Sequence, residues 1–141
     1  MSPSMTQAMT EQGVLSPAGS CKTFDATADG FARGEAVNAI LIKRLDDAIR
    51  DNNPIRAVIR STAVNCDGKI PGMAYPSAES HEVMIRRAYK VASISDVSET
   101  AYVEYHDTGT QIGDWAETTT VANVFGERGV YIGLVRRDST H

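Results

Sequence analysis

The hydrophobic positions follow two different spacings along the chain. Helical patterns, with apolar residues three to four positions apart, predict helices at residues 5–13, 45–50, 77–92 and 115–125. Concentrations of β-branched and aromatic residues predict strands at residues 36–43, 55–65, 101–105 and 129–135. The apolar content of 36–43, 55–65 and 129–135 is typical of central strands that are buried. Helices mixed with buried strands predict an α/β fold.

The predicted helix at residues 77–92 has two contrasting faces. The apolar face, which we expect to be buried, consists of Met84, Ile85, Ala88 and Val91 or Ala92. The opposite face carries Arg86, Arg87 and Lys90. Short basic clusters on helices are ordinarily solvated surface, and the alternative is a docking surface for an acidic partner.

A histidine stands at the end of the strand predicted at residues 101–105. His106 opens a polar, glycine-containing turn, and Asp114 stands where the N-cap of the next helix is expected. Strand, histidine loop and helix in this order are typical of α/β active sites, where side chains at strand ends face a crevice. A purely structural histidine is the alternative. Residues 21–35 form another long polar segment, and long loops in compact domains usually have a function.

Length, charge and cysteine content narrow the possible functions. The 141 residues suffice for one domain, and 14 Lys and Arg against 18 Asp and Glu give a net charge of -4. Neither nucleic acid nor an anionic membrane is therefore an expected partner. Cys21 and Cys66 have no metal-ligand spacing, which argues against a zinc site and a disulfide scaffold. No segment resembles a signal peptide or a membrane span, so we expect a cytoplasmic protein with small-molecule or protein partners.

Three spaced motifs follow one another along the chain. They are Phe24-Asp-x3-Asp29-Gly30-Phe-x-Arg33-Gly34-Glu35, Ile55-Arg-Ala-Val-Ile-Arg-x-Thr-Ala-Val-Asn65-x-Asp67-Gly68-Lys, and Val103-Glu-x-His106-x-Thr-Gly-Thr110-x2-Gly113-Asp114-x2-Glu117. In this order they resemble the ketosynthase domain of type I polyketide synthases, of the fungal, iterative, reducing kind. The resemblance runs from about residue 5 to residue 135. Residues 1–135 are therefore interpreted as a partial ketosynthase domain, and residues 136–141 as a divergent tail.

The resemblance implies a thiolase-like layered α/β fold, of which this chain holds the end of the first half and the start of the second. It also implies the family's reaction, the decarboxylative Claisen condensation that extends an acyl chain by two carbons. A cysteine carries the acyl chain, and an acyl carrier protein brings the malonyl unit on its phosphopantetheine arm. No cofactor or metal bound directly to the chain is implied, and the full-length family is expected to be a homodimer.

The resemblance also assigns roles to individual residues. His106 matches the first of the family's two histidines, where an N–H stabilises the enolate oxygen that forms when malonyl thioester loses CO2. Thr108 and Thr110 match the two threonines whose hydroxyls bind the phosphopantetheine arm, and capping of their own turn is the alternative. Asp114 and Glu117 match an acidic pair that we interpret as supporting residues, with an N-cap sufficient to explain Asp114.

Other parts of the family pattern are missing. Neither Cys21 nor Cys66 lies in the small, Ser-rich setting of the nucleophilic cysteine, and His141 has no Asn-x-Gly-His context of the second histidine. Asp107 stands where the family has Gly, which costs energy if that backbone needs positive φ.

Three interpretations remain open. The chain is part of a ketosynthase that cannot condense alone, or it is a non-catalytic piece that binds a carrier or assembles with another chain through exposed strand edges. The third is a metal site formed by Glu104, His106, Asp107 and Asp114. In each case the apolar faces of residues 55–64 and 130–135 are expected to lie uncovered in the isolated chain.

Overall fold

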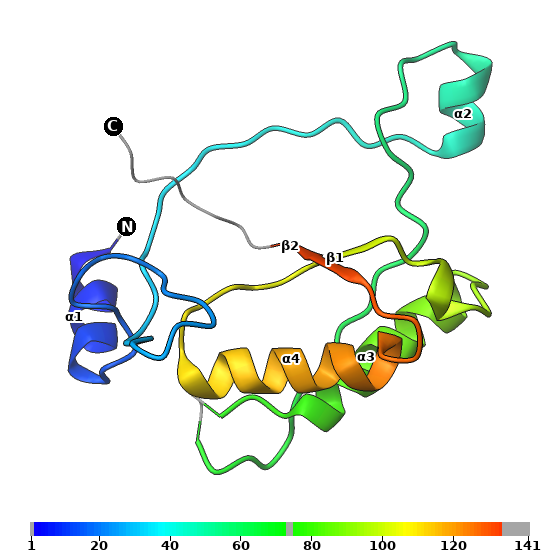
Figure 1. The fold of residues 1–141 in the computed structure, drawn as a ribbon. Helices are drawn as coiled ribbons and strands as arrows, with labels where there is room; N and C mark the ends of the chain where they lie inside the picture. Colours follow the sequence, from blue (N-terminus) through cyan, green and yellow to red (C-terminus); the bar gives the residue numbers. More distant parts are fainter. Residues whose placement is uncertain (1, 73–74, 134–141) are drawn as a thin grey trace.

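The computed structural model describes residues 2–72 and 75–133. Figure 1 shows two arrangements of the chain, one packed and one extended. Residues 78–133, called here the helical unit, form one packed body. Residues 36–65, called here the excursion, run away from it and return. The elements in chain order are α1 (Pro3–Glu11), α2 (Leu45–Arg50), α3 (Ala78–Val91), the 3-10 helix η1 (Val97–Glu99), β1 (Tyr102–Glu104), α4 (Gln111–Phe125) and β2 (Tyr131–Gly133).

The predicted helices are present, with shifts at their ends. Residues 45–50 and 77–92 are confirmed as α2 and α3, and Ser77 caps α3 by accepting a hydrogen bond from the backbone N–H of Ser80 at 3.2 Å. The first helix begins two residues early, because Pro3 fits the first helical turn. The prediction that Asp114 is an N-cap is wrong. Thr110 is the N-cap of α4, so Asp114 lies within its first turn.

The core of the helical unit lies between α3, α4 and β1. Its buried members are Tyr105, Val121, Val124 and Phe125, and Ile85, Tyr89, Val97, Val103 and Val130 pack around them. The rings of Tyr89 and Phe125 meet edge to face with centroids 5.8 Å apart. Of the apolar face predicted for α3, Ile85 packs against this core, whereas Met84 and Ala88 are only half-buried and no residue of α3 is fully buried. Ala92, just after α3, is buried, and Val91 is 62% exposed.

The two strands form a parallel pair connected through α4. Tyr102, Val103 and Glu104 stand opposite Tyr131, Ile132 and Gly133. Strands were predicted at both places and are confirmed, although shorter. Burial of the second strand on both faces is wrong for its described part, because Tyr131 is 82% exposed. Residues 134 and 135 of that prediction, and the tail at 136–141, lie outside the described residues.

The two strands predicted within the excursion are wrong for this structure. Residues 36–43 and 55–65 form no strand, and Leu41 is 97% exposed. A strand requires a hydrogen-bonded neighbour, and the described residues supply none beside these segments. Residues 60–65 instead attach to α3 through side chains, as in the bond from Ser61 Oγ to the Ala88 carbonyl at 2.8 Å. The apolar side chains at residues 55–64 were expected to lie uncovered, and the large ones among them are exposed.

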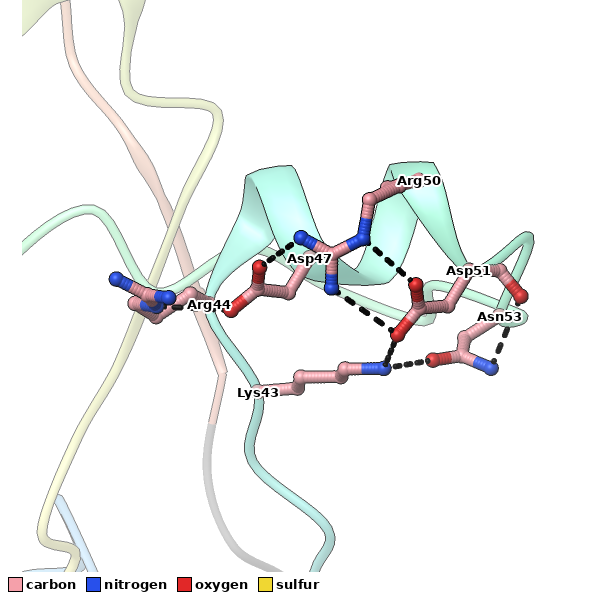
Figure 2. A network of polar contacts seen from close by, with 6 residues as sticks. All are labelled: Lys43, Arg44, Asp47, Arg50, Asp51 and Asn53. Carbon is pink, nitrogen blue, oxygen red and sulfur yellow. Dashed lines mark hydrogen bonds and ion pairs between the residues drawn. The ribbon is translucent and has the colours of Figure 1, made fainter.

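Helix α2, at the far end of the excursion, is held by local charge pairs (Figure 2). Asp47 accepts hydrogen bonds from Arg44 at 2.8 Å and from Arg50 at 2.7 Å. Asp51 binds Lys43 Nζ at 2.5 Å, and this contact lowers the pKa of the Asp51 carboxyl. All these partners lie within residues 43–51, so the charge pairs that hold α2 are local.

The basic face of α3 is partly used within the chain. Arg86 donates to Glu82 Oε1 at 2.8 Å and to the Asn123 carbonyl at 3.2 Å, which ties α3 to α4. Arg87 and Lys90 are exposed, as a solvated face predicts. Within residues 2–72 and 75–133, no helix is long and apolar enough to cross a membrane.

Candidate functional site

The histidine loop, residues 105–110, leaves β1 through two left-handed backbone positions. Asp107 has φ 62° and Gly109 has φ 65°. The positive φ anticipated at Asp107 is therefore observed. Gly109 is also required for space, because a Cβ there would lie 2.6 Å from the backbone nitrogen of Lys22. The loop is consequently both tightly turned and pressed against residues 21–35.

Glu117 holds the backbone of the loop from α4. Its Oε1 accepts a hydrogen bond from the His106 N–H at 2.5 Å, and its Oε2 accepts one from the Asp107 N–H at 3.4 Å. Charge-assisted bonds of this kind are stronger than neutral ones. The His106 ring is exposed. The carboxylate thus fixes the main chain and leaves the imidazole accessible.

The long loop at residues 21–35 supports the histidine loop from the other side. Asp114 Oδ2 accepts from the Phe24 N–H at 2.9 Å, and the Gly109 carbonyl accepts from the Gly30 N–H at 3.2 Å. The rings of Phe24 and Tyr105 meet edge to face at 5.7 Å. Asp114 therefore joins α4 to the loop at residues 21–35, a contact that the N-cap interpretation missed.

The two threonine hydroxyls meet beside the start of α4. Thr108 Oγ1 and Thr110 Oγ1 are 3.1 Å apart, and Thr110 Oγ1 accepts from the Gly113 N–H at 3.2 Å. The capping alternative is thus observed for Thr110. It does not exclude ligand binding, because a hydroxyl both donates and accepts.

A cleft of about 760 Å³ opens in front of the loop. Among the predicted site residues, His106, Thr108, Thr110 and Glu117 line it, whereas Asp114 does not. Neither cysteine is among its lining residues, and both are exposed elsewhere. Several other residues that line the cleft were not predicted as site residues. They are Asp29, Gly30, Phe31, His81 and Gly113. For Asp29, Gly30 and Phe31 the signal was their long, Asp- and Gly-containing loop.

Several carboxylates lie at or next to the site, and some of them change the pKa of a neighbouring group or have their own pKa changed. Burial, followed by the Glu117 charge, raises the pKa of the Tyr105 phenol. At the rim, Lys22 Nζ lies 2.7 Å from Asp29 Oδ2 and lowers the pKa of that carboxyl. Asp107 and Asp114 are both buried, and Oδ1 of each has no hydrogen-bond partner among the described residues. No group of three or more His, Cys, Asp and Glu that could hold a metal ion occurs there either, so the alternative ligand set gains no support.

Two family models match the chain. The beta-ketoacyl synthase C-terminal domain matches residues 56–141, and the beta-ketoacyl synthase N-terminal domain matches residues 1–48. The chain belongs to the beta-ketoacyl synthase family. The ketosynthase resemblance of the three motifs is confirmed.

Curated relatives of this chain are highly reducing polyketide synthases. The chain is 62% identical over 141 residues to the highly reducing polyketide synthase g433 of Fusarium sp, and 63% identical over 142 residues to gloL of Glarea lozoyensis. Each alignment covers 100% of this chain and 6% of the relative, so the chain spans about 6% of the length of these relatives.

Solved ketosynthases have the same fold. The ketosynthase from module 6 of the bacillaene synthase of Bacillus subtilis 168 superposes with a TM-score of 0.86 at 39% identity, covering 95% of this chain and 25% of that one. The oxazolomycin ketosynthase domain OzmH KS7 of Streptomyces albus gives 0.85 at 32% identity, covering 95% and 24%. The predicted partial thiolase-like α/β fold is confirmed.

Proposed function

We propose that this chain carries the malonyl-facing part of a polyketide synthase ketosynthase site. The observation that carries the proposal is the cleft in which His106, Thr108 and Thr110 lie together. An imidazole N–H and two hydroxyls at one opening suit a thioester on a flexible, amide-containing arm. The partner is then the phosphopantetheine arm of an acyl carrier protein, which acts as the substrate carrier.

In the proposed reaction, the malonyl thioester loses CO2 and its negative charge moves onto the thioester oxygen. The His106 N–H stabilises this oxygen. The enolate carbon then attacks the thioester carbonyl of an acyl-cysteine, the cysteine thiolate leaves, and a β-ketoacyl thioester remains on the carrier. Glu117 supports the step by holding the His106 backbone, and Asp114 supports it by joining α4 to residues 21–35.

The chain by itself is proposed to be unable to condense. Condensation requires an acyl-cysteine facing the cleft, and neither Cys21 nor Cys66 lines it. Both sit outside the Ser-rich setting expected of the nucleophile. Residues 1–135 are proposed as partial ketosynthase domain and 136–141 as a divergent tail, and the whole synthase as a cytoplasmic homodimer.

The test is CO2 release from malonyl-pantetheine by the 141-residue chain. We expect no condensation with an acyl-pantetheine acceptor, and CO2 release that His106→Ala lowers about 100-fold or more. His106→Gln retains a side-chain N–H and should lose less. Cys21→Ser and Cys66→Ser serve as matched controls and should leave release unchanged. Release that is insensitive to His106→Ala, or a β-ketoacyl product from the chain alone, contradicts the proposal.

A second candidate is an assembly segment without chemistry. It is favoured by the exposed apolar residues of the excursion, among them Val37, Leu41 and Val64. In that case the chain releases no CO2 and self-associates at micromolar concentration, and Leu41→Lys restores the monomer in sedimentation.

A further inference from the structure

A second imidazole belongs to the cleft and comes from a different helix. His81 lies in the first turns of α3 and lines the same cleft as His106. The residue is half-buried, and its ring has no hydrogen-bond partner within residues 2–72 and 75–133. The reaction proposed above uses His106 and gives His81 no role. His81 is therefore a cleft residue whose donor capacity is still available to a ligand.

The position of His81 is fixed through α4, against which α3 lies (Figure 1). Thr120 of α4 is buried, and its Oγ1 lies 3.0 Å from the Ala78 carbonyl oxygen of α3, within hydrogen-bonding distance. Residues three positions apart share a face of a helix, so His81 lies beside Ala78. By the same spacing Glu117 lies beside Thr120, and Glu117 holds the His106 backbone. Both imidazoles are thus attached to one anchored pair of helices.

The charges around the cleft leave the two imidazoles as its cationic groups. The described residues that line the cleft include no Lys and no Arg. The acidic lining residues already have partners, since Lys22 binds Asp29 at 2.7 Å and backbone N–H groups of the histidine loop bind Glu117. An imidazole donates one N–H when neutral and two when protonated. An anionic group that enters the cleft therefore finds its donors at His81 and His106.

A malonyl thioester presents two acceptors, the thioester oxygen and a free carboxylate. The first is assigned to His106 in the proposed function, which leaves the carboxylate without a partner. We infer that His81 binds this carboxylate and is the specificity-determining residue by which the cleft selects a malonyl over an acetyl carrier arm. The inference rests on the proposed function and specifies its substrate. Hydrogen bonds to a charged acceptor are stronger than neutral ones, which suits a residue that confers selectivity.

His81 then acts on binding rather than on the loss of CO2. As the bond between the methylene carbon and the carboxylate carbon breaks, CO2 leaves and the negative charge moves to the thioester oxygen. A hydrogen bond to the carboxylate therefore stabilises the bound substrate more than the transition state. In CO2 release from malonyl-pantetheine, His81→Ala should raise KM about three- to tenfold without lowering kcat, whereas His106→Ala lowers kcat.

Binding is measured with two pantetheine amides, one malonyl and one acetyl, in which NH replaces the thioester sulfur. They are titrated into the 141-residue chain and followed by NMR, with the α4 amide signals reporting that each variant is folded. The parent chain should bind the malonyl amide about three- to tenfold more tightly than the acetyl amide. His81→Ala should remove this preference and leave acetyl binding unchanged, and His81→Gln, which retains an N–H donor, should keep part of it. Val83→Ala, at an exposed position of the same helix, is the matched control and should keep all of it.

The outcomes separate this inference from the carrier site itself. A parent chain without the preference, or a preference that survives His81→Ala, overturns the role of His81 and leaves the carrier site intact. A loss of kcat in His81→Ala as large as in His106→Ala also overturns it. An acetyl amide that shifts no signal at His106, Thr108 or Thr110 overturns the carrier site. If His81→Ala does not fold, His81→Glu decides, because a carboxylate at this position should make the malonyl amide the weaker ligand.

Discussion

The helical unit and the excursion contain apolar residues of the same types, but the hydrophobic core cluster forms in the helical unit. Val124 and Phe125 on α4 are each 6% exposed, whereas Val37 and Leu41 in the excursion are almost fully exposed. Helices satisfy their own backbone hydrogen bonds, so α3 and α4 need only each other to bury a face. An extended segment needs a neighbouring strand before it can bury anything. The histidine loop and α4 belong to the helical unit, and residues 21–35 complete the site from outside it.

The first prediction sets a core residue against an exposed one. Phe125→Ala should lower the free energy of unfolding of the chain by about 3–5 kcal/mol, because it empties a buried space and removes the ring contact with Tyr89. Leu41→Ala should change it by less than about 0.5 kcal/mol. Urea denaturation measures both. A Leu41→Ala loss as large as that of Phe125→Ala would mean that the excursion is packed after all.

The second prediction compares the cost of alanine at two glycines that have nearly the same positive φ. Gly109 has φ 65° and Gly68 has φ 68°, but a Cβ at Gly68 meets nothing within 4 Å. Alanine should cost about 1–2 kcal/mol at Gly68 from backbone strain alone. It should cost clearly more at Gly109, where the Cβ meets residues 21–35. Equal losses in urea denaturation would show that this contact with the histidine loop contributes nothing.

The third prediction concerns the buried carboxylate beside His106. Asp107→Gly relieves the left-handed backbone and removes an oxygen that lacks a described partner, and should stabilise the chain by about 1 kcal/mol. Asp107→Ala keeps the strained left-handed backbone, so it should stabilise the chain by less. A thermal melt distinguishes the two variants. Destabilisation by Asp107→Gly would reveal a partner for the carboxylate.

The fourth prediction is the smallest effect on the free energy of unfolding, and it appears only at alkaline pH. Burial raises the pKa of the Tyr105 phenol in the folded chain, so its neutral form favours folding. This contribution is complete below the ordinary tyrosine pKa of about 10, and is lost as pH rises through the raised value. Tyr105→Phe should therefore show less alkaline destabilisation than the parent chain. Tyr131→Phe is the exposed control, and an identical response of both variants would contradict the burial effect.

The sequence predicts local structure better than long-range contacts. The spacing of apolar residues located α2 and α3, because a helix is determined by its own side chains and caps. The same reasoning misplaced the start of α4, because Thr110 and Asp114 are both good N-caps and only the Phe24 contact assigns Asp114 elsewhere. Strands were wrongly predicted at residues 36–43 and 55–65, since an apolar run does not reveal whether a partner strand is present. Among the candidate site residues, the motif pointed to His106, which lines the cleft, whereas the space at Gly113, where a Cβ would lie 2.5 Å from Thr110 Oγ1, became visible only in three dimensions.

Amide hydrogen exchange of the chain, read residue by residue, tests most directly whether the helical unit is packed and the excursion is not. We predict slow exchange along α3 and α4 and at the His106 amide, which is bound by Glu117. We also predict fast exchange through residues 36–43 and 55–65. Slow exchange across the excursion, or fast exchange at α3, α4 and His106, would contradict this difference between the two regions.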